Sequence, residues 1–300
     1  MNFLTEQLKC TIFHPDQELF QTTYSNSKMK TPTKVRSVFG ELKFPKAPDQ
    51  RPYIYGCMVL SFDGKMSFSD EPEGTLISKN NFFDPKGAAL DFWVMNVCRC
   101  YADAVILGCG TLHVRKNKMW YAQISDDDLI VARSEMGKKT REPLSIITSL
   151  DGTDIPFEHT IFRMNPAPLI MTSHSGADLI KKTMSRSVRV IDRPENLLCE
   201  SEKIRVIVAG EEKADTVSLL RLLRLCGIEY VSVEAPGYIW FLLESKVLDE
   251  YFLNYSGVFA GGKMALGALN PFTSNRHPHQ SLLTLGYTKG FIFTRQKILY

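Results

Sequence analysis

Short apolar runs separated by turn residues recur along most of this chain. Residues 53–62 (YIYGCMVLSF) are rich in β-branched and aromatic residues and end at Asp63-Gly64, which predicts a strand that runs into a turn. Residues 103–107 (DAVIL) form a shorter apolar run bounded by Gly108, as expected of a buried strand. Similar runs predict further strands at 144–150, 167–173, 203–210, 228–234 and 249–256.

Segments with helical spacing of apolar residues lie between these strands. They cover 88–101, 214–227 and 237–246, and the second of them stops at Gly227. Strands that alternate with helices in this way predict βαβ crossovers and a largely parallel sheet covered on both faces. Residues 286–300 (GYTKGFIFTRQKILY) predict a terminal strand or hairpin at the sheet edge.

The first part of the chain has a different pattern. Residues 1–50 show no sustained hydrophobic period and lead into a proline-rich stretch, FPKAPDQRP, which favours an extended connector. We therefore expect an N-terminal extension over residues 1–50, draped over the domain of residues 51–300 or over a neighbouring subunit. The sequence contains no internal repeat and no low-complexity block.

Composition and charge narrow the class of protein. With 300 residues, 44% of them apolar and 23% charged, the chain can bury a full core, which excludes global disorder, collagen and coiled coil. Its net charge of +3 is too small to make nucleic acid the default partner, although small anions remain candidates. No apolar run approaches the roughly 18 residues that span a bilayer, and the N-terminus carries an acid where a secretory signal would be apolar. We expect a cytoplasmic protein without membrane contact.

The cysteine and histidine patterns argue against a metal site or a disulfide framework. The cysteines are odd in number and scattered through apolar segments without C-x-x-C pairs, which predicts buried, reduced thiols. Cys98 and Cys100 would point about 200° apart on a helix, so they cannot clamp one ion. His277 and His279 have no nearby third ligand and lie in a polar stretch, which favours a solvated loop.

A charged turn follows the first predicted core strand. Ser61-Phe62-Asp63-Gly64-Lys65 places a carboxylate and an ammonium just past the carboxyl end of that strand, where open α/β sheets bind ligands. Such a pair can orient a polar substrate. A solvated turn with a chance charge pair explains the same residues equally well.

Glycine-bearing turns follow several of the other predicted strands. Gly108-Cys109-Gly110-Thr111 opens a predicted helix, so its backbone N–H groups can cradle a phosphate; the motif lacks the remaining residues of the known phosphate-binding fingerprints, and a tight structural turn explains it equally well. Glu234-Ala235-Pro236-Gly237 and Gly261-Gly262 also occupy strand ends. Together these turns can line one cleft, which favours a cofactor site. The sequence has no G-x-S-x-G elbow, which weakens a hydrolase interpretation.

The order of these motifs resembles that of a known enzyme family. The segments RPYIYGCMVLSFDGKMS, TLISKNN, CYADAVILGCGTL, REPLSIITSLDG and GIEYVSVEAPGYIWFLLESKVLDEYFLNYSGVFAGG follow one another as in the reductase domain of the bifunctional riboflavin deaminase/reductase family. The resemblance covers roughly residues 51–300 and implies a three-layer α/β fold of the dihydrofolate reductase-like type. Its central sheet would be mostly parallel with an antiparallel C-terminal edge, its cofactor NADPH and its assembly a homodimer.

The resemblance also implies roles for particular residues. Ser61, Asp63 and Lys65 would lie beside the nicotinamide and the substrate, with Asp63 and Lys65 as catalytic residues and Ser61 and Lys65 as substrate-binding residues. Thr148 and Ser149 match a position suited to the adenosine 2′-phosphate, but two hydroxyls without an adjacent Arg make a poor phosphate clamp. The residues expected to bind the cofactor are Gly108, Gly110, Thr111, Thr148, Ser149, Glu234, Gly237, Gly261 and Gly262.

This chain departs from the family pattern at several points. The family usually reads E-G-G-P where this chain reads Glu234-Ala235-Pro236-Gly237, and it continues after Thr111 into an acidic D-D-P segment where this chain reads LHVRKNKMWYA. The basic residues of that stretch would attract an anionic substrate or form a solvated face; they are Arg115, Lys116 and Lys118. The zinc-binding signatures of the deaminase domain are absent from the sequence.

The sequence therefore favours an NADPH-dependent reductase of a small polar compound, similar to the riboflavin-pathway pyrimidine reductase. Two alternatives stay open: the same fold and cofactor with a pterin or another carbonyl or imine substrate, and a non-catalytic nucleotide-binding protein. As an NADPH-dependent reductase, the protein would position its ligands and stabilise charge, while the cofactor would supply the hydride.

Overall fold

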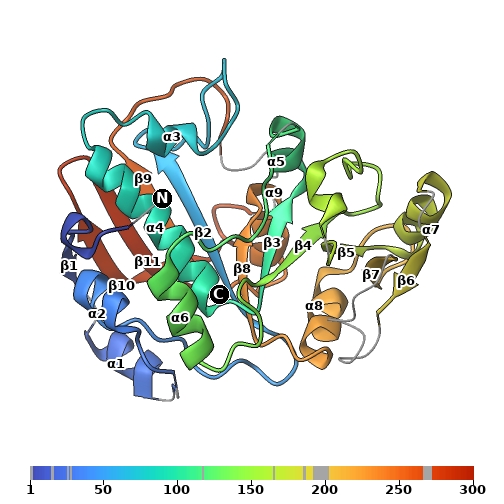
Figure 1. Ribbon diagram of the computed structural model, residues 1–300, viewed down its shortest axis with the longest axis horizontal. Coiled ribbons are helices and arrows are strands. Elements are labelled where there is room, and N and C mark those ends of the chain that lie inside the picture. The colour runs from blue at the N-terminus through green and yellow to red at the C-terminus, as the bar shows by residue number, and fades with distance from the viewer. Residues whose placement is uncertain are drawn as a thin grey trace.

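The described residues of the computed structural model form one α/β fold (Figure 1). They are residues 3–14, 17–25, 27, 29–116, 118–164, 166–184, 187–191, 203–265 and 272–300. Among them, no helix is both long enough and apolar enough to cross a lipid bilayer.

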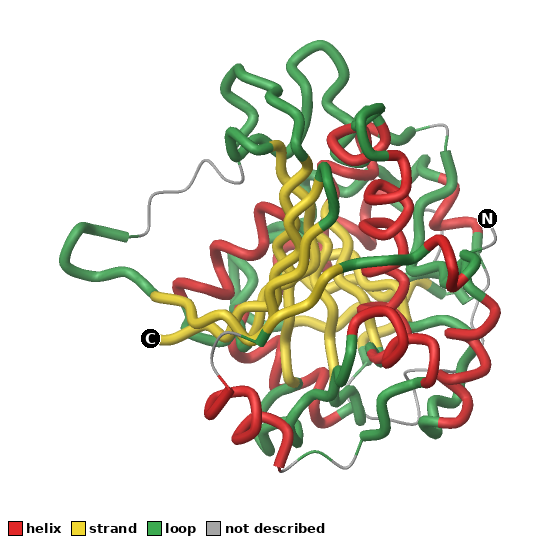
Figure 2. Tube along the Cα trace, turned by 90° about the vertical axis from the view of Figure 1, so that its left-hand side faces the viewer, coloured by secondary structure: helices red, strands yellow, loops and turns green. Residues whose placement is uncertain are grey.

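A single twisted sheet runs through the middle of the molecule, with helices on both sides of it (Figure 2). From one edge to the other its strands are β1 (Thr11–Phe13), β10 (His279–Tyr287), β11 (Phe291–Leu299), β9 (Glu250–Ser256), β2 (Tyr53–Ser61), β8 (Tyr230–Glu234), β3 (Ala104–Gly108), β4 (Leu144–Thr148), β5 (Leu169–Thr172), β7 (Ile204–Val208) and β6 (Val188–Val190). From β9 to β6 all neighbouring strands are parallel, whereas β1, β10 and β11 pair antiparallel. The predicted parallel sheet with an antiparallel C-terminal edge is confirmed.

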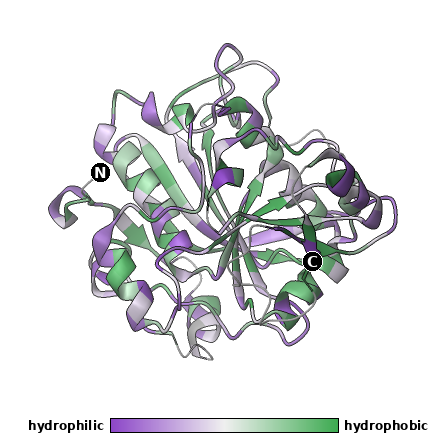
Figure 3. Cartoon of the chain, turned by 45° about the vertical axis from the view of Figure 1, so that its right-hand side comes forward, coloured by the Kyte–Doolittle hydropathy of each residue, from purple (hydrophilic) through white to green (hydrophobic). Residues whose placement is uncertain are grey.

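Alternating side chains of the strands divide the core into two layers. In β2, Tyr53, Tyr55 and Cys57 face one hydrophobic cluster and Ile54 faces the other. The first cluster packs against α2 (Thr33–Phe39), α4 (Pro85–Tyr101), α6 (Asp127–Glu135) and α7 (His174–Thr183), and the second against α8 (Thr216–Leu225) and α9 (Pro236–Glu244). The remaining helices are α1 (Gln17–Ser25), α3 (Leu76–Lys79) and α5 (Cys109–Val114), with 3₁₀ turns at Thr5–Gln7 and Thr160–Arg163. Figure 3 shows hydrophobic residues gathered in the central strands and hydrophilic ones on the surrounding loops. The three-layer architecture is therefore confirmed.

The first fifty residues share their core with the rest of the chain. Strand β1 pairs with β10, and Phe44 is fully buried with its ring stacked 4.4 Å from that of Tyr55. The Tyr101 hydroxyl donates a 2.7 Å hydrogen bond to the Leu42 carbonyl. The sequence showed no period here because the helices α1 and α2 are short and connected by irregular segments.

The C-terminal hairpin is longer than the sequence indicated. Its first strand begins at His279, in a stretch that we expected to be a solvated loop. His279 and Gln280 are exposed, so the start of β10 carries no hydrophobic alternation that would have revealed it. His277 remains an exposed residue outside the strand.

The turns after the parallel strands are where the sequence placed them. Gly64 after β2 and Gly152 after β4 have φ angles of 77° and 80°, a conformation that glycine adopts without strain. Because β2, β3, β4 and β8 are parallel neighbours, the segments that follow them meet at one edge of the sheet. The candidate site lies at this edge.

Candidate active site

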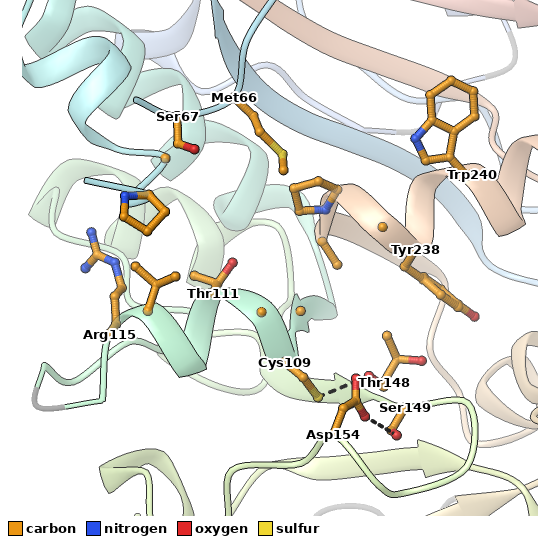
Figure 4. A pocket seen from close by; sticks show the side chains of 18 of the residues that line it. Met66, Ser67, Cys109, Thr111, Arg115, Thr148, Ser149, Asp154, Tyr238 and Trp240 are labelled. Carbon is orange, nitrogen blue, oxygen red and sulfur yellow. Dashed lines mark hydrogen bonds between the residues drawn. The ribbon is translucent and has the colours of Figure 1, made fainter. Parts of the chain in front are cut away.

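The carboxyl ends of β3, β4 and β8 enclose a cavity of about 580 Å³, which we call cavity A (Figure 4). Its size is typical of a pocket for a small molecule or cofactor. It brings together most of the residues that the sequence nominated for cofactor binding: Gly108, Gly110, Thr111, Thr148, Ser149 and Gly237. Side chains of Met66, Tyr238, Trp240 and Phe241 provide apolar walls.

Two helices start at cavity A without side-chain caps. Helix α5 follows Gly108 and α9 follows Ala235, and neither cap residue has a side chain that bonds the first N–H groups. Backbone N–H groups at helix starts attract negatively charged ligand groups. Pro236 occupies the first position of α9, where its missing N–H costs nothing.

Gly110 and Gly237 indicate that a ligand occupies this space. A Cβ added to either residue would meet no protein atom within 4 Å, and neither has a positive φ angle. They are the two described glycines that combine these features, so neither backbone conformation nor packing within the chain explains them. Both line cavity A, where a Cβ would take up room that a closely bound ligand needs.

The end of cavity A beside β4 is polar and acidic. The Ser149 hydroxyl donates a hydrogen bond to the Asp154 carboxylate and accepts one of 2.9 Å from the Gly152 N–H. Burial, and after it the charge of Asp154, raises the pKa of the Cys109 thiol. Figure 4 shows Asp154 close to both Cys109 and Ser149. The Asp154 carboxylate therefore lies next to Cys109, the central residue of the Gly108-Cys109-Gly110 turn.

A second cavity of about 450 Å³, cavity B, adjoins the first between β2, α3 and α4. Both cavities are lined by Met66, Gly74, Thr111, Arg115 and Pro236. Both also hold buried polar atoms without a hydrogen-bond partner among the described residues: Ser67 Oγ and Tyr238 Oη in cavity A, and the indole Nε1 of Trp120 in cavity B. Such atoms are costly unless a ligand or water satisfies them. The arrangement provides two neighbouring ligand compartments with a shared wall.

Asp91 is a buried acid in the wall of cavity B. It comes from helix α4, is 9% exposed, and accepts a 2.8 Å hydrogen bond from Asn254 Nδ2. Burial raises its pKa to about 6, against the opposing effect of its hydrogen bonds. A carboxyl group with this pKa can hold a proton near neutral pH and give it to a ligand.

A buried ion pair includes Glu234, which lines cavity B. The Arg99 guanidinium donates from Nε and Nη2 to the two oxygens of Glu234, at 2.7 and 2.6 Å, and Nη1 donates to the Gln123 carbonyl. Burial lowers the pKa of Arg99, but the charge of Glu234, its hydrogen bonds and the smaller effects of Cys57 and Glu142 together outweigh burial, and the net shift is upward. Glu234 thus lines cavity B, and its ion pair with Arg99 holds helix α4 against strand β8. It does not line cavity A, where we expected it to bind the cofactor.

Arg115 lies at the junction of the two cavities. Its Nη2 donates to Glu73 and, at 2.9 Å, to Thr75 Oγ1, and its guanidinium carbon lies 4.1 Å from the centre of the Trp120 ring. Lys118 also bonds Glu73, at 3.1 Å. Burial opposes ionisation of Glu73, but its hydrogen bonds and these cations hold its pKa below the ordinary value. This cluster ties the segment after β2 to α5.

The turn after β2 is held by its own hydrogen bonds. Asp63 accepts from Ser61 Oγ at 2.6 Å and from the backbone N–H groups of Ala260 and Gly261 at 3.0 and 2.8 Å. The Ser61 bond and the two N–H groups hold the pKa of Asp63 below its ordinary value. Lys65 Nζ donates to the Asp63 carbonyl at 3.0 Å. None of these side chains, nor Gly261 or Gly262, lines cavity A or cavity B.

Sequence reasoning missed Asp91, Arg99, Glu73 and Asp154. The first two did carry a signal, because Asp91 and Arg99 interrupt otherwise apolar helical runs, AALDFWV and NVCRCY, and a charge inside such a run is rarely buried without a partner or a role. Glu73 and Asp154 lie in irregular segments, where no period distinguishes a lining residue from an exposed one.

Comparison with known proteins supports the resemblance that the motifs carry. A curated 2,5-diamino-6-ribosylamino-4(3H)-pyrimidinone 5′-phosphate reductase from Archaeoglobus fulgidus is 23% identical over 220 residues, which are 71% of this chain and 84% of that protein. No protein-family model matches the chain.

Solved structures share the fold. A pyrimidine reductase-like protein from Corynebacterium diphtheriae has a TM-score of 0.61 at 16% identity, covering 94% of this chain and 98% of that one. The bifunctional diaminohydroxyphosphoribosylaminopyrimidine deaminase/5-amino-6-(5-phosphoribosylamino)uracil reductase from Thermotoga maritima has a TM-score of 0.52 at 16% identity, covering 82% of this chain and 56% of that one. The findings support an enzyme of the reductase class with the fold of the riboflavin-pathway reductases.

Proposed function

We propose that this protein reduces a ribosylaminopyrimidine 5′-phosphate with a nicotinamide dinucleotide as hydride donor. The observation that carries the proposal is the pair of adjoining cavities. Hydride transfer requires two ligands in contact, and the two cavities meet at five residues that line both of them. The substrate class comes from the similar reductase of Archaeoglobus fulgidus.

The residues of cavity A fit a dinucleotide. Uncapped starts of α5 and α9 face the space where a pyrophosphate would lie, and Gly110 and Gly237 leave room for its close approach. The apolar wall of Tyr238, Trp240 and Phe241 suits flat rings. A bound dihydronicotinamide supplies the hydride. The sequence resemblance implies that this dinucleotide is NADPH.

The residues of cavity B suit a polar, anionic substrate. Lys79 and Arg115 line cavity B and both pair with Glu73, so this group keeps a net positive charge for a phosphate. Trp120 provides an aromatic face and an unused N–H donor. When hydride adds to a carbon that is doubly bonded to nitrogen or oxygen, that heteroatom must gain a proton. We assign this proton to Asp91, whose carboxyl group is the acid of cavity B with a raised pKa.

We propose for Asp63 and Lys65 a role other than the catalytic one that the sequence suggested. Since their side chains bond the turn and the loop of residues 260–261, and line neither cavity, we propose that they position Met66 and Ser67. They are therefore positioning residues in this proposal, without contact to the substrate.

We expect Lys65→Ala to lower kcat/KM by about tenfold through misplacement of this segment, and Lys65→Arg to retain most of it. Steady-state kinetics of both variants, with melting temperature as a check of folding, measure the effect. Unchanged kinetics in Lys65→Ala would remove the positioning role. A loss of more than about a thousandfold in both variants would instead indicate direct substrate contact.

Gly110→Val should obstruct the dinucleotide without disturbing the fold. The branched side chain would fill space that the protein leaves open, so the Kd for the dinucleotide should rise by at least about tenfold, and Gly110→Ala should raise it less. Quenching of Trp fluorescence measures the Kd, since Trp240 lines cavity A. Unaltered affinity in folded Gly110→Val protein would contradict the assignment of this cavity.

The proposed function is tested by oxidation of the reduced dinucleotide in the presence of candidate substrates. Purified protein should consume the dinucleotide with the ribosylaminopyrimidine 5′-phosphate and leave pterins and simple carbonyl compounds unchanged. Turnover of a pterin alone would replace the substrate class and keep the reductase. Binding of the dinucleotide without turnover of any compound would favour the non-catalytic alternative.

A further inference from the structure

Resting on the proposed function, we infer that cavity A selects NADH over NADPH, and that Asp154 is the residue that decides. NADH carries a free 2′-hydroxyl on its adenosine ribose, whereas NADPH carries a phosphate there. The inference therefore depends on which part of the dinucleotide reaches Asp154 and on the charge that it meets.

The position of cavity B fixes the direction of the dinucleotide in cavity A. The reacting nicotinamide must contact the substrate, so it lies at the junction marked by Met66, Thr111 and Arg115. Thr148, Ser149 and Asp154 line cavity A alone, and Figure 4 shows them on the opposite side of the cavity from Met66 and Ser67. With the pyrophosphate at the glycine turn, the adenosine ribose reaches the β4 end and Asp154.

The β4 end carries the wrong charge for a phosphate. A phosphate monoester bears about two negative charges at neutral pH and is held by Arg or Lys in proteins. Among the described residues that line cavity A, Arg115 is the one Arg or Lys. It lies where cavity A meets cavity B, away from the β4 end, and it bonds Glu73 and Thr75. A 2′-phosphate would instead approach the Asp154 carboxylate.

The hydrogen bonds of Ser149 also favour a hydroxyl over a phosphate at this end. The Ser149 hydroxyl already donates to Asp154 and accepts from the Gly152 N–H, so its proton is committed. The His113 ring bonds the backbone carbonyl of Asp154, at 2.8 Å. A carboxylate retains acceptor sites, and a carboxylate near the ribose is the usual partner of the 2′-hydroxyl in NAD-binding proteins.

The test compares binding of NADH and NADPH to the full chain and to Asp154 variants. Trp fluorescence quenching and the shift in melting temperature measure both affinities without turnover. Wild-type protein should bind NADH at least about tenfold more tightly than NADPH, a difference of about 1.4 kcal/mol. Asp154→Ser should narrow this ratio and Asp154→Arg should reverse it. Asp154 is exposed, so folding should tolerate both changes.

Glu158→Gln is the matched control, since it removes an exposed carboxylate from the same irregular segment outside cavity A. Its ratio of affinities should equal that of the wild type. Tighter binding of NADPH by the wild type, or an unchanged ratio in Asp154→Arg, would overturn the inference and leave the proposed reductase standing. Binding of neither dinucleotide by folded protein would overturn the proposed function, and the inference with it.

Discussion

Asp91→Asn should lower kcat by about 10²- to 10⁴-fold, the usual effect of removing a general acid. The amide keeps the shape of the side chain and can still accept the bond from Asn254, but it has no proton to give. The wild-type rate should fall as the pH rises above about 6, where Asp91 loses its proton. This limb of the pH profile should be absent from the residual activity of the variant.

The same variant should be more stable than the wild type at neutral pH. The fold raises the pKa of Asp91 from 3.8 to about 6, so the folded state favours the protonated form. The contribution of Asp91 to stability is complete below about pH 4 and is lost as the pH rises through about 6. By pH 7 this loss amounts to about 3 kcal/mol, which the uncharged amide avoids.

Urea unfolding measures the predicted change in stability, and steady-state kinetics measure the predicted change in kcat. Both are followed at several pH values between roughly 4 and 8, where the protonation of Asp91 is linked to folding. Asp127→Asn is the control, since it removes an exposed carboxylate from α6 outside both cavities. Retention of wild-type kcat by Asp91→Asn would remove the proton-donor role. A loss of stability in the variant at pH 7 would contradict the burial of a destabilising charge.

Glu234→Ala should destabilise the protein by about 3 to 5 kcal/mol, because it leaves the Arg99 guanidinium buried without its counter-charge. Both side chains are nearly inaccessible, at 3% for Arg99 and 6% for Glu234, so the variant loses the main compensation for a buried charge. Replacing both together, as in Arg99→Met with Glu234→Leu, should recover most of the stability, since no isolated charge remains.

Chemical denaturation of Arg99→Met, Glu234→Leu and the variant that carries both changes gives the coupling energy between the residues. The exposed pair of Arg141 and Asp127 provides the control, where Arg141→Ala should change stability by less than about 1 kcal/mol. A loss below about 1 kcal/mol in Glu234→Ala would show that the pair is solvated in solution. The double variant should regain stability without regaining activity, because Glu234 also shapes cavity B.

The sheet was predictable because its evidence is local. Each predicted strand is mostly buried and apolar and is bounded by turn residues, so its own short sequence indicates it. These strands are β2, β3, β4, β5, β7, β8 and β9. The elements that escaped prediction include β1, α1 and the start of β10, which carry exposed side chains, and the helices α6 and α7, which pack against the core. Their structure depends on packing against distant parts of the chain.

The candidate site was predictable to the extent that backbone geometry defines it. Glycines at strand ends imply close approach of a ligand, and the structure brings Gly108, Gly110 and Gly237 to one cavity. The charged residues were not predictable in the same way. Asp63 lies next to the site in sequence but bonds its own turn, whereas Asp91 reaches cavity B from a helix that begins elsewhere. Only the folded chain shows which carboxylate faces a cavity.

The measurement that tests the central claim most directly is transfer of a labelled hydride. The protein is given a reduced nicotinamide dinucleotide with deuterium at the transferable position of the dihydronicotinamide, together with the ribosylaminopyrimidine 5′-phosphate, and the product is examined by mass spectrometry and NMR. If cavities A and B hold cofactor and substrate in contact, the deuterium should appear at one carbon of the product. Product without deuterium, or oxidation of the dinucleotide without a reduced pyrimidine product, would contradict the account.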